Sequence, residues 1–412
     1  MSKTVVPSLL TIPIEIVYRI LDQMTPKNIM KSLREVCQRL NKIIDTYPPY
    51  KKFDRVFLKA GEMDPERFAP LANALKFNKT VTKFEFRGDH IGRCGAEMLE
   101  FNQGVKMVDL DTCTAGGEGA EAFFHALTTN RTLQTLAIRR YNINSSSVHI
   151  LVDALKTLTE LDLEVNFLNE NGTQQLAEAL KVNDTLTTLK FRYNFIGSKG
   201  MKGIGEALKV NKTLKTLSFH DEDVVKDGAL ALAEALKINE TLTSIRILWS
   251  KTDELGVEAL AEALKFNIGL KNIELENAHI SQTGIQALAE ALKINRTITH
   301  FKLEDNTCDA KSAYALAEAL AVNNTLIDLS LKGNRINAEG AKMLAEGLTT
   351  NQGLTTLNLE YNNIGPEGAQ SFAQILQINH TLKKVKLYRN KIGEEGSAAL
   401  ASVKRDGLEL SF

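Results

Sequence analysis

Residues 186–213 read LTTLKFRYNFIGSKGMKGIGEALKVNKT, and units of this kind recur along most of the chain. The first six residues alternate between apolar and polar side chains, which is the period of a β-strand with one buried face. The alternation predicts that Leu189 and Phe191 point inward and that the outward residues are Thr188, Lys190 and Arg192. The later part of the unit, as in GALALAEALK at 228–237, has apolar residues at three- and four-residue spacing among strong helix formers. This spacing predicts an amphipathic helix of roughly ten residues.

The unit recurs at a nearly constant spacing. The residues that open the successive strands are Phe53, Val81, Val105, Leu133, Leu158, Leu186, Leu214, Leu242, Leu270, Ile298, Leu326, Leu354 and Leu382. From Leu158 onward each step is 28 residues, whereas Val81 to Val105 is 24 and Leu133 to Leu158 is 25. The sequence therefore predicts thirteen units, followed by a closing strand in GLELSF at 407–412.

Repetition of a strand and a helix dictates the architecture. A single unit cannot bury its apolar face alone, so neighbouring units must stack into a continuous core. Adjacent strands lie about 4.8 Å apart, whereas packed helices lie about 8–10 Å apart, so the stack must curve. We predict an α/β leucine-rich-repeat solenoid over residues 51–412, a horseshoe with parallel strands on its concave face and helices on its convex face. The consensus L-x-x-L-x-L-x-x-N-x-I-x-x-x-G-x-x-x-L-A-E-A-L-K-x-N resembles the ribonuclease-inhibitor type of repeat over about residues 53–412.

Asparagines recur at two positions of the unit. One closes the strand, where its amide can satisfy buried carbonyl groups of neighbouring turns; these residues are Asn166, Asn194, Asn306, Asn334, Asn362 and Asn390. Cys113 shares this position and is interpreted as a small core residue. The other asparagine follows the helix in triplets such as Asn211-Lys212-Thr213, which resemble glycosylation acceptors. Because the triplets keep the repeat period, we expect them to be structural, with the asparagine in the left-handed conformation that ends a helix.

Function is expected on the strand-lined face, because rigid strands present an extended surface there. Asp111, Arg139, Glu164 and Arg192 form a row of alternating charge across successive units, with further carboxylates beside it at Asp109, Glu160 and Asp162. The row is either a self-neutralised ladder or an acidic or bipolar docking site. Near the far end, an outward basic cluster is formed by Lys384, Lys386, Tyr388 and Arg389, with Tyr361 beside it. The simpler interpretation of that cluster is a solvated end face.

A second candidate for target binding combines Tyr193, Arg246, Leu248 and Trp249. Leu248 and the only tryptophan fall at outward positions of a strand that otherwise places polar residues there. Exposed aromatic side chains beside an arginine are typical of binding hot spots. The alternative is that Trp249 folds over the rim and packs on the adjacent turn.

Residues 9–50 break the period and read LLTIPIEIVYRILDQMTPKNIMKSLREVCQRLNKIIDTYPPY. Pro13 and Pro26 suit the first turns of helices, and Pro48-Pro49 ends a third helix. The spacing resembles an F-box, although Ile12 stands where leucine is usual and no tryptophan follows Cys37. The resemblance implies docking onto a Skp-type adaptor through Ile12, Pro13, Glu15, Ile16, Ile20, Leu21, Val36 and Leu40.

Taken together, an F-box ahead of leucine-rich repeats implies a non-catalytic substrate receptor of a cullin-RING ubiquitin ligase, which binds a target protein through its repeats. The alternative is a regulatory scaffold, similar to innate sensors or GTPase-activating proteins, whose first helices only cap the solenoid. The GTPase-activating version characteristically ends in an acidic tail, whereas this sequence ends at Ser411-Phe412.

Composition excludes several other classes of function. Fifty basic residues balance fifty acidic residues, so no global field favours nucleic acid or an anionic membrane. Four unevenly spaced cysteines without a CxxC pair indicate neither a zinc site nor a disulfide framework. The sequence shows no nucleotide, metalloprotease or nucleophile motif, and His220-Asp221-Glu222-Asp223 is interpreted as a solvated loop. We expect no cofactor, no metal and no catalytic residue, in a cytoplasmic or nuclear protein that has neither a signal peptide nor a membrane span.

Overall fold

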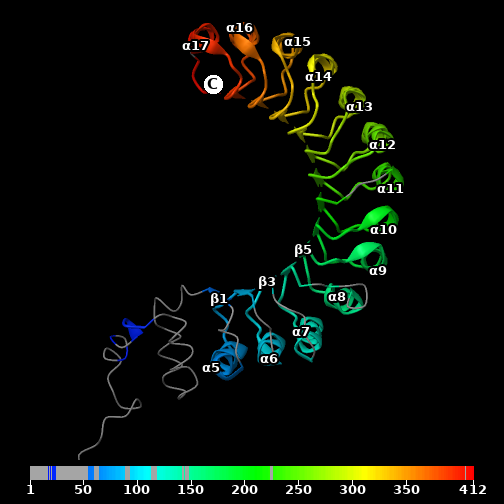
Figure 1. Ribbon diagram of the computed structural model, residues 1–412, viewed down its shortest axis with the longest axis vertical. Coiled ribbons are helices and arrows are strands. Elements are labelled where there is room, and N and C mark those ends of the chain that lie inside the picture. Colours follow the sequence, from blue (N-terminus) through cyan, green and yellow to red (C-terminus); the bar gives the residue numbers. More distant parts are fainter. Residues whose placement is uncertain are drawn as a thin grey trace, which may run out of the picture. The chain divides into compact units, whose positions relative to one another are not determined.

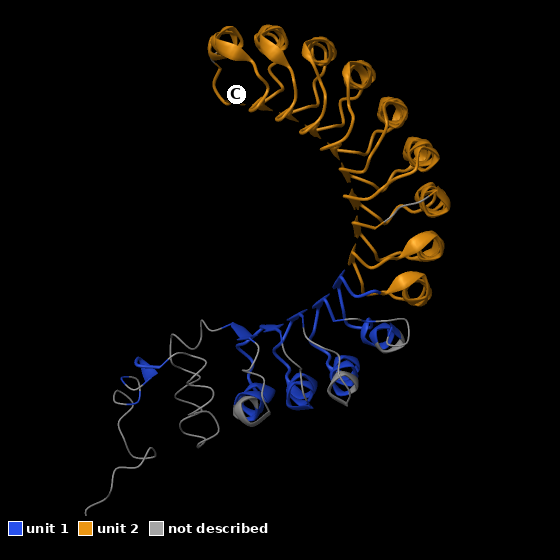
Figure 2. Cartoon of the chain, in the orientation of Figure 1, with its two compact units in different colours: residues 1–167 blue, residues 168–412 orange. Residues whose placement is uncertain are grey.

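The structure is a computed structural model that describes residues 17, 19, 21–24, 54–59, 65–88, 93–112, 118–141, 143, 148–222, 226–403 and 405–412. The chain divides into two compact units, residues 1–167 and residues 168–412 (Figure 2). The division falls inside the predicted repeat region, and nothing in the repeat spacing predicted it. The boundary expected near residue 50 stays a prediction.

Unit 1 alternates strands with helices. Its strands are β1 (Arg55–Lys59), β2 (Lys83–Arg87), β3 (Met107–Asp111), β4 (Thr135–Arg139) and β5 (Glu160–Glu164). They pair in parallel in chain order. The helices between them are α5 (Pro65–Lys76), α6 (Arg93–Phe101), α7 (Glu118–Thr129) and α8 (Val148–Ala154). Lys83 pairs with Met107 and Thr135 with Glu160, so the short steps predicted from the sequence are confirmed in the register.

Unit 2 repeats the same alternation and forms an arc, with strands on its inner side and helices on its outer side (Figures 1 and 2). Its strands are β6 (Thr188–Arg192), β7 (Thr216–His220), β8 (Ser244–Leu248), β9 (Asn272–Glu276), β10 (His300–Lys302), β11 (Asp328–Ser330), β12 (Thr356–Asn358), β13 (Lys384–Lys386) and β14 (Glu409–Ser411). Its helices are α9 (Asn169–Leu180), α10 (Gly197–Val210), α11 (Lys226–Leu236), α12 (Glu254–Phe266), α13 (Gln282–Ile294), α14 (Ala310–Val322), α15 (Ala338–Leu348), α16 (Gly365–Leu376) and α17 (Gly393–Ala401). The leucine-rich-repeat solenoid predicted from the sequence is confirmed, including the closing strand, here β14.

The core lies between the strands and the helices. The strand-opening residues from Val81 to Leu382 are buried, and the predicted inward residues Leu189 and Phe191 are buried as well. Phe53 lies outside the described residues. The Phe191 ring stacks on Phe219 of the next repeat, with centroids 5.9 Å apart. Residues 28 apart therefore meet in register, and each repeat buries the apolar flank of its neighbour.

The asparagines that follow the helices are structural, as predicted, but the expected left-handed conformation was wrong. Asn211, Asn267 and Asn295 are extended, with φ between −68° and −63°. Their side chains bridge successive repeats instead. The Asn267 amide donates to the carbonyl oxygens of Leu236 (2.6 Å) and Asn239 (3.0 Å), and its Oδ1 accepts two backbone N–H groups that follow it. We call this series the helix-exit ladder; in unit 2 it comprises Asn211, Asn239, Asn267, Asn295, Asn323, Asn351 and Asn379.

A left-handed backbone occurs at another position, the residue directly after the outward strand face. We call it the strand-exit position; φ is positive there in Tyr193, Asp221, Trp249, Asn277, Asp305, Gly333, Tyr361 and Arg389. Residues other than glycine pay a conformational penalty in this region. A hydrogen bond to the next repeat helps to hold it, as where the Trp249 N–H donates to the Glu276 carbonyl (2.8 Å). The repeat thus fixes the direction of each strand-exit side chain.

Candidate functional site

The strand face of unit 2 carries the residues predicted for target binding around Trp249. Trp249 follows β8 at the strand-exit position with φ 52° and is 50% exposed. Its indole Nε1 donates to Oε1 of Glu276 at 3.2 Å. The ring is therefore tethered to the next repeat yet keeps half of its surface open. An aromatic side chain with a fixed orientation loses little conformational entropy on binding, which is what a hot spot requires.

Arg246 lies on the same strand, and its charge is already paired. Its Nε donates to Oε2 of Glu274 on β9 at 2.7 Å, and Lys302 on β10 donates to Oε1 of the same carboxylate at 3.2 Å. Glu274 thus bridges two cations on neighbouring strands. The sequence did not single out Glu274 or Lys302, although both fall at the Arg246 position of later repeats.

Leu248 was predicted to be exposed beside Trp249, and this prediction was wrong. It occupies the outward row, in register with His220 and Glu276, but only 7% of its surface is exposed. Parallel strands bring its two register partners close on either side, so an outward position does not leave a short apolar side chain open. Leu248 therefore offers little surface to a partner.

Tyr193 extends this group of candidate residues toward the start of unit 2. Its half-exposed ring lies 6.2 Å from the His220 ring, centroid to centroid. The His220 Nε2 in turn lies 2.9 Å from Oδ2 of Asp221. We call Tyr193, His220, Arg246 and Trp249, with the carboxylates Glu274 and Glu276, the Trp249 patch.

Glu222 corrects the interpretation of residues 220–223 as a solvated loop. Only 1% of Glu222 is exposed, and its carboxylate accepts the backbone N–H groups of Asn194 and Ile196 (3.2 Å for the second). These are the contacts that Asn306 Oδ1 makes to Ala278 and Ile280 in a later repeat. Glu222 falls 28 residues after Asn194, so the repeat period was the signal that could have identified its buried position.

The environment of Glu222 changes its protonation. Burial raises its pKa from 4.5 to about 7, and the hydrogen bonds from Asn194 and Ile196 act in the opposite direction. An ionised carboxylate can accept hydrogen bonds but cannot donate one, unlike the amide of asparagine. The ionised form of Glu222 therefore reproduces only the accepting half of the role that asparagine has at this position, and the raised pKa favours the protonated form, which can also donate.

In unit 1, the acidic residues predicted for target binding lie on the strand face but are engaged by arginines. Arg139 forms ion pairs with Asp109, Asp162 (3.9 Å) and Glu164 (3.2 Å). Asp111 pairs with Arg140 and also lies 3.8 Å from Arg87. Of the two interpretations left open by the sequence, these pairs favour the self-neutralised ladder, because the acidic row carries its own counter-charges.

A second aromatic group lies near the end of unit 2. The rings of Tyr361 and Tyr388 are half-exposed and meet edge to face, with centroids 6.2 Å apart. The Arg389 guanidinium lies over both rings, 5.8 Å from the Tyr361 centroid and 5.5 Å from that of Tyr388. The ammonium of Lys332 lies 5.6 Å from the Tyr361 centroid. We call these four residues and Lys386 the tyrosine–arginine cluster.

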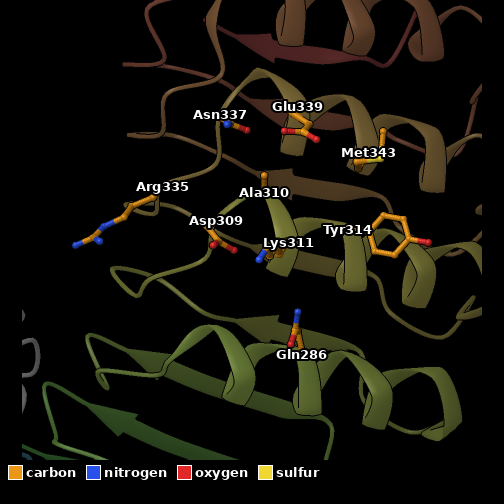
Figure 3. Close-up of a pocket in the computed structure, with 9 residues that line it drawn as sticks. All are labelled: Gln286, Asp309, Ala310, Lys311, Tyr314, Arg335, Asn337, Glu339 and Met343. Atoms are coloured by element: carbon orange, nitrogen blue, oxygen red, sulfur yellow. The ribbon is translucent and has the colours of Figure 1, made fainter.

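A depression of about 590 Å³ lies among the helix starts of α13, α14 and α15 (Figure 3). Asp309 and Asn337 contribute to its wall, but both are helix caps that already accept backbone N–H groups, of Ser312 (2.9 Å) and Gly340 (3.0 Å) respectively. Tyr314 lies at one end and Arg335 at the other (Figure 3). The polar wall is thus partly committed to helix capping, and we assign no ligand to it.

Most residues predicted to bind the adaptor lie outside the described residues; these are Ile12, Pro13, Glu15, Ile16, Ile20, Val36 and Leu40. Leu21 is described and is fully buried, as is Val17 nearby. A buried Leu21 does not present its side chain to a partner. Its substitution would therefore test folding of the segment rather than docking.

Among the residues that the structure describes, no three histidine, cysteine, aspartate or glutamate side chains are grouped as a metal site would require. Cys308 is buried, and burial raises the pKa of its thiol well above the usual range, which disfavours the reactive thiolate. In the described part of the chain, no helix combines the length and apolar character needed to cross a bilayer.

Comparison with known proteins identifies the repeats. The family described as "Leucine Rich repeat" matches residues 182–205, 322–345 and 350–373, each stretch spanning a strand and most of the following helix. No curated protein matches this chain. Among solved structures, the crystal structure of the Rad7 and Elc1 complex in yeast is similar at 16% identity and a TM-score of 0.47, over 98% of both chains. Leiomodin-1 actin-binding site 2 is similar at 22% identity and a TM-score of 0.30, over 34% of this chain and 85% of that one.

Proposed function

We propose that this protein is a non-catalytic substrate receptor of a cullin-RING ubiquitin ligase. In this proposal, residues 9–50 bind a Skp-type adaptor, and the strand face of unit 2 binds the protein to be ubiquitylated. The leucine-rich repeats suggest a protein-interaction role in general. The receptor role rests, in addition, on the resemblance of residues 9–50 to an F-box.

The observation that carries the target-binding half is the state of Trp249. A large aromatic side chain is held half-exposed on a rigid strand exit by its hydrogen bond to Glu276. Beside it lies the ion-paired Arg246. Tryptophan and arginine are enriched in the energetic centres of protein interfaces. The arrangement suits a protein surface better than a small molecule, because the patch lies on an extended strand face.

The adaptor half is tested by co-elution of the purified full chain with a purified Skp-type adaptor in size-exclusion chromatography. We expect a stable complex that is lost in a Glu15→Lys, Ile16→Asp double variant. Leu21 is left unchanged because it is buried. Phe266→Ala serves as a matched control, since Phe266 is an exposed aromatic residue at the end of α12, outside both proposed binding regions.

Two results would contradict the receptor role. One is the absence of any complex between the intact chain and the adaptor. The other is equal co-elution of the intact chain and the Glu15→Lys, Ile16→Asp variant, provided that both show the same helix content by circular dichroism.

A further inference from the structure

The cations of the tyrosine–arginine cluster differ from Arg246, Lys302 and Lys384 in having no ion-pair partner among the described residues. In the middle of unit 2, Arg246 and Lys302 share the Glu274 carboxylate. At the end of the unit, Lys384 pairs with Glu409 at 2.6 Å. For Lys332, Lys386 and Arg389, by contrast, no carboxylate of the described residues lies at ion-pair distance, although Asp305 interacts with Lys332 at longer range. Their charges remain available to an external anion.

The geometry of the cluster orients these cations. The Arg389 guanidinium lies over both tyrosine rings, and Lys332 lies over Tyr361. Arg389 also forms a side-chain hydrogen bond with Tyr388, and the cation–π contacts restrict the side chains without using their remaining N–H donors. Tyr361 and Arg389 also occupy strand-exit positions with φ of 57° and 61°, so the backbone directs both side chains outward. The result is a set of N–H donors held in place on a rigid surface. Donors arranged in this way bind carboxylate groups well.

We propose that the tyrosine–arginine cluster binds an acidic segment of a partner protein, through carboxylates that reach Arg389, Lys386 and Lys332. This inference deepens the proposed function, because it assigns a chemical class to part of the target. It concerns a surface at the end of unit 2, separate in the sequence from the Trp249 patch and from residues 9–50.

A protein segment fits the cluster better than a nucleic acid does. Single-stranded nucleic acids bind by stacking bases on open aromatic faces. Here the cations of Lys332 and Arg389 lie over the Tyr361 ring, Arg389 also lies over the Tyr388 ring, and the two rings meet at an angle of 81°, so a base would compete with these cations for the ring faces. The chain as a whole also carries no excess positive charge. Carboxylates need only N–H donors, and the Arg389 guanidinium has several besides the one directed to Tyr388.

One carboxylate opposes the ligand and provides a sharp test. Glu360 is the residue that immediately precedes Tyr361, and its strand-face row contains Lys332 and Tyr388, which lie 28 residues before and after it. Its negative charge repels an acidic segment. We therefore expect Glu360→Gln to tighten binding, whereas loss of the cations weakens it.

The test measures binding of fluorescein-labelled octaglutamate to the full chain by fluorescence anisotropy at low ionic strength. An octaglutamine peptide and a twelve-nucleotide single-stranded DNA are the comparison probes. We expect octaglutamate to bind, and an Arg389→Ala, Lys386→Ala double variant to lose about tenfold or more in affinity, because charge-assisted hydrogen bonds are lost. Glu360→Gln should gain about two- to threefold, and binding should weaken with added salt. Lys271→Ala, an exposed lysine that precedes β9, is the matched control and should change nothing.

The proposal is overturned if the double variant binds octaglutamate as tightly as the parent chain, if octaglutamine binds equally well, or if DNA binds more tightly than the acidic peptide. It is also overturned if octaglutamate does not bind at all. These outcomes are independent of adaptor co-elution. The receptor role can therefore fail while peptide binding is intact, and peptide binding can fail while the adaptor still co-elutes. The two experiments distinguish these results.

Discussion

Unit 2 contains two ladders of asparagine positions, and only one of them is unbroken. The helix-exit ladder has asparagine in every repeat from Asn211 to Asn379. The other series is the asparagine that closes each strand, one residue after the strand-exit position; we call it the strand-closing ladder. It begins in unit 2 with Asn194 and resumes at Asn306, but Glu222, Ser250 and Ala278 occupy the three positions between them. The two ladders share one fold and one period, so the difference between them reports what each position must do.

The helix-exit ladder demands an amide. Each side chain there donates to two carbonyl groups of preceding repeats and accepts two backbone N–H groups of its own turn, as Asn239 does with Leu208, Asn211, Thr241 and Leu242. Asparagine supplies both donors and acceptors on a short stem. The strand-closing ladder tolerates a carboxylate, a hydroxyl and a methyl group. Glu222, Ser250 and Ala278 lie in and beside the repeat that presents Trp249. The requirement for an amide is therefore weaker in the part of the strand face that we propose for recognition.

The largest expected effect comes from breaking the intact ladder. Asn267→Ala removes four hydrogen bonds and leaves buried the carbonyl groups of Leu236 and Asn239 and the N–H groups of Gly269 and Leu270. We expect the free energy of unfolding to fall by about 4 kcal/mol, since each unsatisfied buried group costs about 1–3 kcal/mol. Urea unfolding followed by circular dichroism measures this change. A loss below about 1 kcal/mol would mean that water or a shifted backbone replaces the ladder.

A smaller effect is expected from Glu222, and it depends on pH. The folded state raises the pKa of Glu222 from 4.5 to about 7, so between these values the folded protein holds a proton that the unfolded chain releases. Stability from this group is therefore complete below pH 4.5 and is lost as pH rises to about 7. The shift corresponds to roughly 3 kcal/mol. Glu222→Gln should remove this dependence, which is measured as the difference between the urea midpoints of parent and variant from pH 4.5 to 8. A constant difference across that range would show that Glu222 does not titrate as described.

The smallest effect on stability is expected from a substitution of Trp249, on the exposed strand face. Trp249→Ala removes a half-exposed ring and one hydrogen bond to the half-buried Glu276 carboxylate. We expect the free energy of unfolding to change by less than about 1 kcal/mol. A loss as large as that of Asn267→Ala, by the same urea measurement, would make Trp249 a structural residue and remove it from the binding patch.

Much of the fold followed from the period of the sequence. Apolar alternation identified the strands, helical spacing identified the helices, and the unequal steps near Val105 and Leu158 reappear in the strand register. These features are local or periodic, so a single sequence carries them. The division at residue 167 does not arise from the period and was not predicted.

The candidate site was predicted less completely, because its details depend on contacts between repeats. Trp249 was identified, but its tether to Glu276 depends on which carboxylate lies on the next strand. Leu248 was placed on the correct face and is nevertheless covered. Glu222 was misread because a charged residue in a polar run suggests solvent. Only its distance of 28 residues from Asn194 indicates that the repeat buries it.

The most direct test asks which face of unit 2 meets a partner protein. A photo-reactive benzoylphenylalanine is placed at Trp249 in one full-length chain and at Phe266 in another, and each is irradiated in cells. Both positions carry exposed aromatic residues, one at a strand exit and one at the end of α12. We predict discrete covalent adducts from the Trp249 position and none from the Phe266 position. Adducts from Phe266 alone, or equal adducts from both positions, would contradict recognition through the strand face.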